Sequence, residues 1–390
     1  MNAYPDVLVV GAGVIGASTA FHLARAGVAV QVVERAAAGS GMSSRSSALI
    51  RMHYSFGPEV ELAVRSDRMF DTWPDLVGRP AFVRRTGFVR IVCPGEEGHL
   101  AANVEMMASL GADVHVVDGS TLAELAPGMA TEDVIVAAWE PRGGFGDGAV
   151  VAGDFLAAAR ESGASYRPGT TVTSLRRHGD RIVGVEAGGE VLAAGAVVVA
   201  NNVWSPGLLR TIGVELPIEA ELHRVAHVRH APGAGAPVAV IDSVTRTYMR
   251  PEGSGFDRTL VGDEFGGRRG VDPDGVAPSA PVEDVADLVE AATGRVPALA
   301  DAGITGATTG VLDMTPDGRP LLGALPGWEG LVLATGLSGT GFKVSPAIGE
   351  AVAALFTGTP AGAVDITPFR PGRFQEGAAI SSPFPYGDEW

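Results

Sequence analysis

A glycine-rich turn between a short apolar run and a helical segment is the feature that most constrains the fold of this chain. Residues 11–16 read GAGVIG, which fits the pattern GxGxxG. The β-branched run Val7–Val10 precedes the turn, residues 15–26 have a helical pattern, and residues 28–33 are typical of a second strand. This order predicts a βαβ unit with the glycine turn at the start of its helix.

Each position of the turn has its own physical role in binding a dinucleotide. Gly11 allows a tight turn, Gly13 lets the backbone approach a pyrophosphate, and Gly16 lets the helix pack closely on the strand. The helix then begins with Val14 and Ile15, and its unpaired amide groups and positive dipole end attract phosphate. A strand, a helix, a second strand and an acidic residue together make the dinucleotide prediction specific.

The acidic residue is Glu34, which ends the second predicted strand. Its carboxylate can accept both ribose hydroxyls of an adenosine, which favours an unphosphorylated ribose. The motif does not distinguish NAD from FAD. An NAD dehydrogenase usually continues with uninterrupted βα units, whereas here Arg35 and a Ser-rich loop at residues 40–47 follow. The rest of the chain therefore favours FAD.

The domain organisation follows from three apolar runs that lie far apart, at Val7–Val10, residues 197–200 and residues 331–334. If they share one sheet, the fold is α/β, with a Rossmann-like FAD-binding domain assembled from three segments. We assign residues 1–78, 142–214 and 305–372 to that domain, and residues 79–141 and 215–304 to a second, mixed-sheet substrate domain. Residues 373–390 are interpreted as a C-terminal tail packed on the surface.

Composition and charge argue against several classes of partner and of metal site. The net charge of -16 disfavours nucleic acid and anionic lipid. The apolar runs are too short to span a membrane, and the first residues lack the pattern of a signal peptide, so we expect a cytoplasmic protein. The one cysteine, Cys93, excludes an internal disulfide or a thiolate metal site, and no metal is predicted.

Beyond the first motif, the sequence resembles the D-amino acid oxidase superfamily of flavoproteins, in the branch of sarcosine, dimethylglycine and glycine oxidases. The resemblance covers nearly the whole chain, and the order and spacing of its motifs make it specific. After residues 7–35, the matching motifs are SGMSSRSS at 40–47, LIR at 49–51, VVVA at 197–200 with Trp204, YMRPE at 248–252, MTPDGRP at 314–320 and GLSGTGFK at 336–343.

The resemblance implies a set of residues that contact FAD. A glycine-rich turn after a buried strand also offers amide groups that can stabilise negative charge on a reduced flavin, as expected at residues 336–343. The expected contacts are Gly11, Gly13, Val14, Ile15, Gly16, Glu34, Arg35, Ser43, Ser44, Arg45, Val172, Ala200, Trp204, Gly310, Gly339, Thr340, Gly341, Phe342 and Lys343.

Two departures from the family bear on how the flavin is held. Monomeric sarcosine oxidases tether it through a cysteine at the position that matches Gly310, and dimethylglycine-type enzymes through a histidine at the position that matches Arg45. Neither residue here is such a tether, so we expect non-covalent FAD.

The resemblance also places Arg51 and Lys343 at the flavin face, where they can clamp a substrate carboxylate. Alternatively, each has an ordinary role, as partner of a structural carboxylate or as a solvated residue. Tyr248 and Arg250 alternate on a predicted strand and are pocket candidates, although a cross-strand surface pair explains them equally well. Four further residues could line the pocket or assist deprotonation, namely His53, Tyr54, His223 and His227.

The activity that the resemblance implies is hydride removal from the carbon next to the nitrogen of an amino acid or N-alkyl amino acid, followed by hydrolysis of the imine. An FAD-dependent 2-hydroxy acid dehydrogenase is the main alternative. An NAD-dependent dehydrogenase and a non-catalytic flavin-binding subunit are weaker alternatives.

The reaction with oxygen stays open. Sarcosine oxidases use a lysine to activate oxygen, and residues 260–262 contain no lysine, so the enzyme can be an oxidase or a dehydrogenase. The expected partner is a small amino acid or amine; the oligomeric state stays open.

Overall fold

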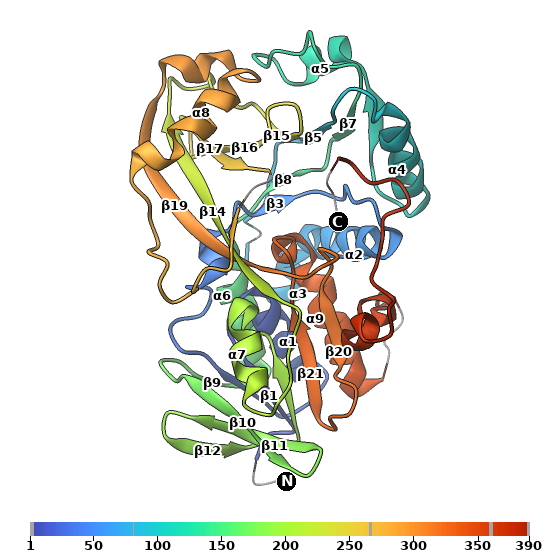
Figure 1. The fold of residues 1–390 in the computed structure, drawn as a ribbon, viewed down its shortest axis with the longest axis vertical. Helices are drawn as coiled ribbons and strands as arrows, with labels where there is room; N and C mark the ends of the chain where they lie inside the picture. The colour runs from blue at the N-terminus through green and yellow to red at the C-terminus, as the bar shows by residue number, and fades with distance from the viewer. Residues whose placement is uncertain (1–3, 81, 265–266, 359–361, 388–390) are drawn as a thin grey trace.

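The fold consists of two bodies of sheet and helix stacked along the long axis of the molecule (Figure 1). The structure is a computed structural model, and it describes residues 4–80, 82–264, 267–358 and 362–387. A six-stranded sheet with its helices makes up the lower body, and a nine-stranded sheet with shorter helices makes up the upper one.

The lower sheet brings together strands from three distant parts of the chain. Its order is β20-β21-β13-β1-β2-β9, and all neighbours are parallel except β20 and β21. The prediction that the three apolar runs share one sheet is therefore confirmed. The strands are β1 (Val7–Val10), β2 (Val30–Val33), β9 (Ser165–Arg167), β13 (Ala196–Val199), β20 (Leu321–Ala324) and β21 (Leu331–Thr335).

Alternation along these strands divides the core between the two faces of the sheet. Val7 and Val9 pack with the long helices, whereas Leu8 and Val10 pack on the opposite side. The long helices are α1 (Val14–Arg25), α2 (Gly57–Asp71), α6 (Gly148–Glu161) and α9 (Gly341–Thr357). The opposite face carries α7 (Ser205–Arg210) and an antiparallel meander of β10 (Val172–His178), β11 (Arg181–Ala187) and β12 (Glu190–Ala193).

The upper sheet combines residues on either side of the meander. Its order is β18-β14-β17-β16-β15-β5-β7-β6, with β19 paired to β14. The strands are β5 (Phe88–Ile91), β6 (His115–Val117), β7 (Ala137–Glu140), β14 (Glu219–Arg229), β15 (Ala239–Asp242), β16 (Thr247–Glu252), β17 (Arg258–Asp263), β18 (Arg268–Arg269) and β19 (Gly303–Met314).

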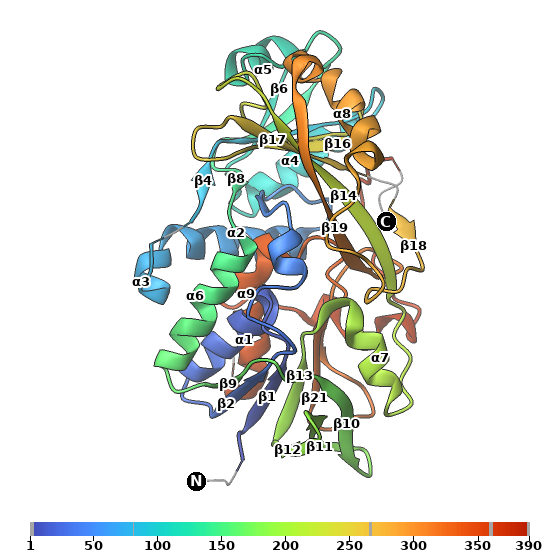
Figure 2. The ribbon, with the colours of Figure 1, turned by 90° about the vertical axis from the view of Figure 1, so that its left-hand side faces the viewer.

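The paired strands β14 and β19 run from the upper body down to the lower one (Figures 1 and 2). β19 begins at Gly303, close to the domain boundary that we placed at residue 305. The division into domains stays an interpretation, in which this pair of strands belongs to both bodies.

Shorter elements complete the described part of the chain. β3 (Leu49–Ile50), β8 (Gly144–Phe145) and β4 (Arg84–Arg85) form a small sheet between the two bodies. The remaining helices are α3 (Trp73–Val77), α4 (Glu97–Ser109), α5 (Gly119–Leu125), α8 (Ala286–Thr293), and six short 3-10 turns, Met42–Arg45, Asn202–Trp204, Val282–Val285, Pro297–Asp301, Thr367–Phe369 and Pro371–Phe374.

The helical patterns of the sequence predict single helices at residues 58–76, 281–293 and 345–356, and these three predictions were wrong in their limits. The segment 58–76 is two helices that meet at Thr72, because Pro74 cannot donate to the preceding turn. The segment 281–293 begins with a 3-10 turn, and α8 starts only at Ala286. The helix predicted from residue 345 already starts at Gly341, so the end of the glycine-rich motif is its first turn.

The prediction that the tail, residues 373–390, packs on the surface was wrong for two of its side chains. Arg373 and Tyr386 are at most 1% exposed, and Tyr386 belongs to the same core as α1 and α2.

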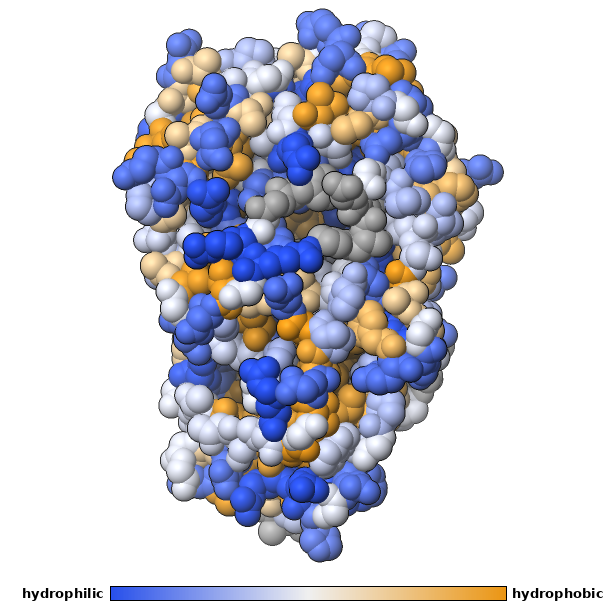
Figure 3. Space-filling view, viewed as in Figure 1, coloured by the Kyte–Doolittle hydropathy of each residue, from blue (hydrophilic) through white to orange (hydrophobic). Residues whose placement is uncertain are grey.

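On the face seen in Figure 3, hydrophobic residues are interspersed with hydrophilic ones. None of the helices in the described part of the chain has both the length and the apolar character needed to cross a bilayer.

Candidate active site

A cavity of about 810 Å³ lies where the two bodies meet. Its wall is formed by the carboxyl ends of β1, β2 and β13, by the first turn of α9, and by the cavity-facing side of β14, β15, β16 and β19. Ligands of open α/β sheets bind beyond the carboxyl ends of parallel strands, so the position agrees with the predicted dinucleotide site.

The first glycine motif has the close packing that its sequence predicts. Gly11 has φ +101°, and a Cβ there would lie 2.6 Å from the Ala200 carbonyl oxygen. A Cβ on Gly16 would lie 2.0 Å from the Gly11 oxygen, so Gly16 serves helix packing and does not line the cavity. Gly13, Val14 and Ile15 do line it, so the N-terminus of α1 faces the cavity, where a phosphate can bind.

Glu34 is fixed at the end of β2 by two backbone amides. Its Oε2 accepts from Ala12 N at 2.9 Å, and its Oε1 accepts from Ala36 N at 2.9 Å. Each carboxylate oxygen can accept a second hydrogen bond, so the group remains able to bind two ribose hydroxyls. The residues present therefore fit an adenosine dinucleotide with an unphosphorylated ribose.

A three-residue clamp lies at the adenosine end of the cavity. The Arg35 guanidinium carbon lies 3.7 Å from the ring centroid of Trp204, and both side chains donate to Asp274 Oδ1 at 2.9 Å. All three residues line the cavity. Asp274 comes from the substrate-side segment and had no signal in the sequence, because it lies in a polar loop between turns.

The Ser-rich loop contributes unevenly. Ser43 lines the cavity, and its Oγ accepts from Val14 N at 3.1 Å. Ser44 is not brought to the cavity, because its side chain is exposed and donates to the Gly41 oxygen at 2.9 Å. Arg45 lines the cavity, and its Cβ lies 4.0 Å from where a Cβ of Gly310 would be. The two positions that carry tethers in relatives are therefore neighbours here.

The C-terminal glycine motif closes the cavity from the other side. Gly339, Thr340, Gly341, Phe342 and Lys343 all line it, and so do Val172, Ala200 and Trp204. A carboxylate that the sequence analysis missed, Asp313, holds the turn by accepting from Gly336 N at 2.6 Å. Burial raises the pKa of Asp313 to about 6.

Arg51 and Lys343 converge on one aromatic ring, although they are far apart in sequence. The Arg51 guanidinium carbon lies 4.7 Å and Lys343 Nζ 5.5 Å from the ring centroid of Tyr54. Both residues line the cavity, and Nε of Arg51 is buried without a hydrogen-bond partner among the described residues. Burial, together with the Arg51 charge, holds the pKa of Lys343 well below its ordinary value. An anion bound here would pair with Arg51 and would raise the pKa of Lys343 toward its ordinary value, which favours the charged form of its amine.

Glu140 supports the segment that carries Arg51. It is fully buried, and its Oε2 accepts from Met52 N at 2.6 Å. Burial raises the pKa of Glu140 to about 8. This residue was also missed, because a single glutamate at the end of a strand has no distinguishing sequence pattern.

His53 lines the cavity, but both ring nitrogens face protein groups. Nε2 is 2.9 Å from the Tyr386 hydroxyl oxygen, and Nδ1 is 3.9 Å from Glu140 Oε1. Burial and the nearby charges of Arg90 and Arg51 hold the pKa of His53 well below its ordinary value, so the imidazole is neutral. This geometry favours a structural position over proton exchange with a substrate.

The structure separates Tyr248 from Arg250. Tyr248 lines the cavity and its ring lies over Gly262, where a Cβ would be 2.2 Å from the ring. Arg250 is buried outside the lining and donates from Nε to the Ser47 oxygen at 2.7 Å, so it holds the Ser-rich loop. His227 also lies away from the cavity, between Glu252 and Thr308.

His223 is the centre of an ionic cluster on the cavity wall. Its Nδ1 is 2.9 Å from Asp263 Oδ1, and its Nε2 is 2.8 Å from Glu221 Oε1. The other carboxylate oxygen of Glu221, Oε2, accepts from Arg269 Nε. Burial opposes the imidazolium charge, but the hydrogen bonds with Asp263 and Glu221 outweigh it and raise the pKa of His223 to about 9.

We expect His223→Gln to destabilise the protein in a pH-dependent way. Because the folded pKa of about 9 exceeds the unfolded value of 6.5, the stabilisation is fully present below pH 6.5 and is lost as the pH rises through 9. The upper limit is about 3 kcal/mol, at about 1.4 kcal/mol per pKa unit. Urea unfolding of both proteins between pH 6 and 10 measures it. A destabilisation that is constant over this range contradicts the assignment.

The fold and the cavity together define a two-body dinucleotide-dependent oxidoreductase. Over residues 6–355 the chain matches the family described as FAD dependent oxidoreductase. The chain belongs to this family, and FAD is its cofactor.

Curated relatives align over nearly their whole length. The chain is 27% identical to the N-methyl-L-tryptophan oxidase of Salmonella typhi, with 95% of this chain and 99% of the relative covered. It is also 27% identical to the glycine oxidase of Geobacillus kaustophilus, with 93% and 96% covered. Among solved structures, the L-proline dehydrogenase of P. horikoshii superposes with a TM-score of 0.88 at 25% identity, with 97% and 100% covered.

Proposed function

We propose that this enzyme removes a hydride from the carbon next to the nitrogen of an amino acid or N-alkyl amino acid, using non-covalent FAD. The observation that carries the proposal is the convergence of Arg51 and Lys343 on Tyr54 inside the cavity. The names of the relatives, oxidases of N-methyltryptophan and glycine and a dehydrogenase of proline, agree with this substrate class.

In this proposal the two cations bind the substrate carboxylate. Arg51 offers a planar fork of donors and Lys343 a point charge, and together they orient the neighbouring carbon. Their positive field also disfavours an ammonium group nearby, which lowers the pKa of the bound amine and releases its proton without a dedicated base. Bound FAD supplies the hydride acceptor. The imine product hydrolyses in water.

Non-covalent binding is supported by the two positions at which relatives carry a tether. Gly310 has no side chain, and Arg45 has no nucleophile at neutral pH. Glu34 and the Arg35–Trp204–Asp274 clamp line the cavity, so they can contact the adenosine part of FAD without a covalent bond.

The test starts with the visible spectrum of the purified protein, before and after acid precipitation. We expect bands near ~375 and ~450 nm, as for an oxidised flavin, and colour that stays in the supernatant. Coloured pellets would contradict non-covalent binding.

A second experiment identifies the substrate class. The intact flavoprotein is titrated without oxygen with amino acids, N-methyl amino acids and 2-hydroxy acids. Bleaching by hydroxy acids alone would overturn the amine assignment, and peroxide yield under air separates oxidase from dehydrogenase.

A further inference from the structure

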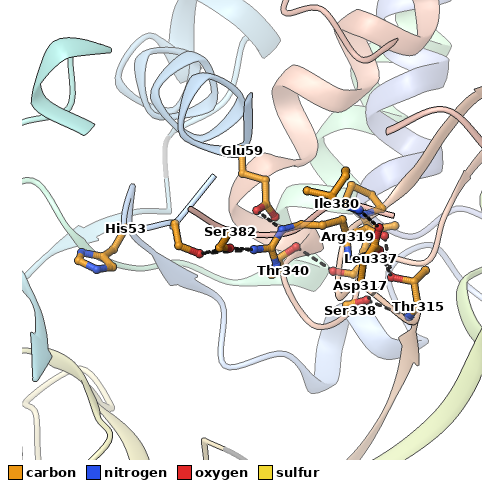
Figure 4. A network of polar contacts seen from close by, with 12 residues as sticks. His53, Glu59, Thr315, Asp317, Arg319, Leu337, Ser338, Thr340, Ile380 and Ser382 are labelled. Carbon is orange, nitrogen blue, oxygen red and sulfur yellow. Dashed lines mark hydrogen bonds and ion pairs between the residues drawn. The ribbon is translucent and has the colours of Figure 1, made fainter. Parts of the chain in front are cut away.

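The last described residues of the chain, 380–387, return to the candidate active site. Ile380 N donates to Asp317 Oδ2 at 3.0 Å. Ser382 Oγ accepts from Arg319 Nη2 at 2.8 Å and lies 2.7 Å from Ser55 Oγ. Figure 4 shows Ser382 beside the Arg319 guanidinium, with Glu59 on the other side of that group. Residues 380–387 are called the C-terminal segment below.

Tyr386 continues these contacts toward the substrate side of the cavity. It is only 1% exposed, and its hydroxyl lies 2.9 Å from His53 Nε2. The two rings stack with centroids 5.6 Å apart and an interplanar angle of 28°. The Arg90 guanidinium carbon lies 5.2 Å from the centroid of the Tyr386 ring.

The C-terminal segment acts on the cavity through other residues. Its described residues do not line the cavity, yet four of the side chains that they contact do. Ser382 contacts Ser55 and Arg319, and Tyr386 contacts His53 and Arg90. The segment is therefore a second layer behind the substrate side of the wall.

The contact with His53 leads directly to Arg51. The Arg51 guanidinium donates through Nη1 to the backbone oxygen of His53, so the place of His53 determines where that guanidinium lies. We propose that Tyr386 is a positioning residue, which fixes Arg51 at the substrate carboxylate through His53. This inference rests on the proposed function, because it gives a purpose to the position of Arg51.

Loss of the Tyr386 hydroxyl removes the hydrogen-bond partner of a buried imidazole nitrogen. His53 is 3% exposed, so water cannot readily replace that partner, and a different ring orientation becomes favourable. In this proposal, repacking of the buried His53 ring displaces the main chain that carries it, and with it the oxygen that accepts from Arg51 Nη1. A displaced fork makes a poorer charge-assisted hydrogen bond with a bound carboxylate, so the affinity for that carboxylate falls.

The test is Tyr386→Phe, which keeps the ring and removes only the hydroxyl. We expect KM for the best amino acid substrate, and Kd for acetate measured by the flavin spectrum, to rise roughly 5- to 10-fold, as for the loss of one buried hydrogen bond. We expect kcat to change less than twofold and the flavin content to stay the same. Phe384→Ala is the matched control, because Phe384 lies in the same segment but is 38% exposed; its KM should stay within twofold of the wild-type value.

The outcomes separate this inference from the proposed function. If Tyr386→Phe lowers the melting temperature but leaves KM and the acetate Kd unchanged, Tyr386 only stabilises the fold and the inference is overturned. An equal rise of KM in Phe384→Ala also overturns it, because any disturbance of the segment would then suffice. If the wild-type protein neither binds acetate nor reacts with any amino acid, the proposed function fails, and this inference fails with it.

Discussion

An Arg51→Met variant should keep its FAD and lose roughly 10²- to 10³-fold in kcat/KM for the amino acid substrate. Loss of a charged partner in a buried ion pair typically costs about 2–5 kcal/mol, and the substrate carboxylate would be left beside Lys343 alone. Lys343→Met should have an effect of the same order, because Lys343 is only 7% exposed and lies at the same ring. Steady-state kinetics with the flavin content determined for each variant measure the effect.

Two controls make this prediction specific. Arg51→Lys keeps the charge but not the planar fork, so its loss should be smaller than that of Arg51→Met. In the double variant the effects should be less than additive, because both side chains bind one carboxylate. An Arg51→Met protein that is purified without flavin would place Arg51 in cofactor binding instead. Full activity in both single variants would remove the basis of the proposed function.

The parts of the fold that could be predicted from the sequence are those with a strong local signal. Val7–Val10 is apolar at every position and buried at every position, as a strand covered on both faces must be. The glycine turn after it has steric requirements that only glycine meets, such as the φ of Gly11. The apolar runs pair in one sheet, so the motifs that follow them lie at the same edge of that sheet. Most of the proposed cofactor contacts could therefore be assigned from the motifs alone.

Other features depend on pairing between distant segments, which local patterns do not encode. β19 contains Gly303, Gly306 and Gly310 and several threonines, so it lacks the apolar alternation of a strand, and its pairing along β14 stabilises it. Arg250 was expected beside Tyr248 because the two alternate on one strand. Tyr248 lines the cavity, but Arg250 does not, and its Nε donates to the backbone oxygen of Ser47 in the Ser-rich loop.

The C-terminal segment is the clearest case of this limit. Its composition, rich in Pro, Gly and Ser, is typical of a surface tail. Its place is determined by polar groups elsewhere, such as the Asp317 carboxylate that accepts from Ile380 N. Asp317 lies in a motif that the family resemblance explains, and no local pattern links it to Ile380, which lies more than sixty positions later.

The largest stability effect is expected where Arg373 meets Asp317. Arg373 is 0% exposed and donates to both Asp317 oxygens at 2.8 Å, and also to the backbone oxygens of Arg319 and Pro320 at 2.8 Å. Arg373→Met leaves a carboxylate buried without its counter-charge, which typically costs about 3–5 kcal/mol. We expect a loss of this size in the free energy of unfolding, measured by denaturant titration with FAD bound.

The chain provides a matched control three residues earlier. Arg370 pairs with Glu376 at 2.5 Å, but the two side chains are 41% and 47% exposed, so water screens the interaction. Arg370→Met should therefore cost less than about 1 kcal/mol. Adding Asp317→Asn to Arg373→Met should restore part of the lost stability, because the unpaired charge is then removed. Burial is what distinguishes the two pairs. Equal losses of stability for Arg370→Met and Arg373→Met would therefore contradict this prediction.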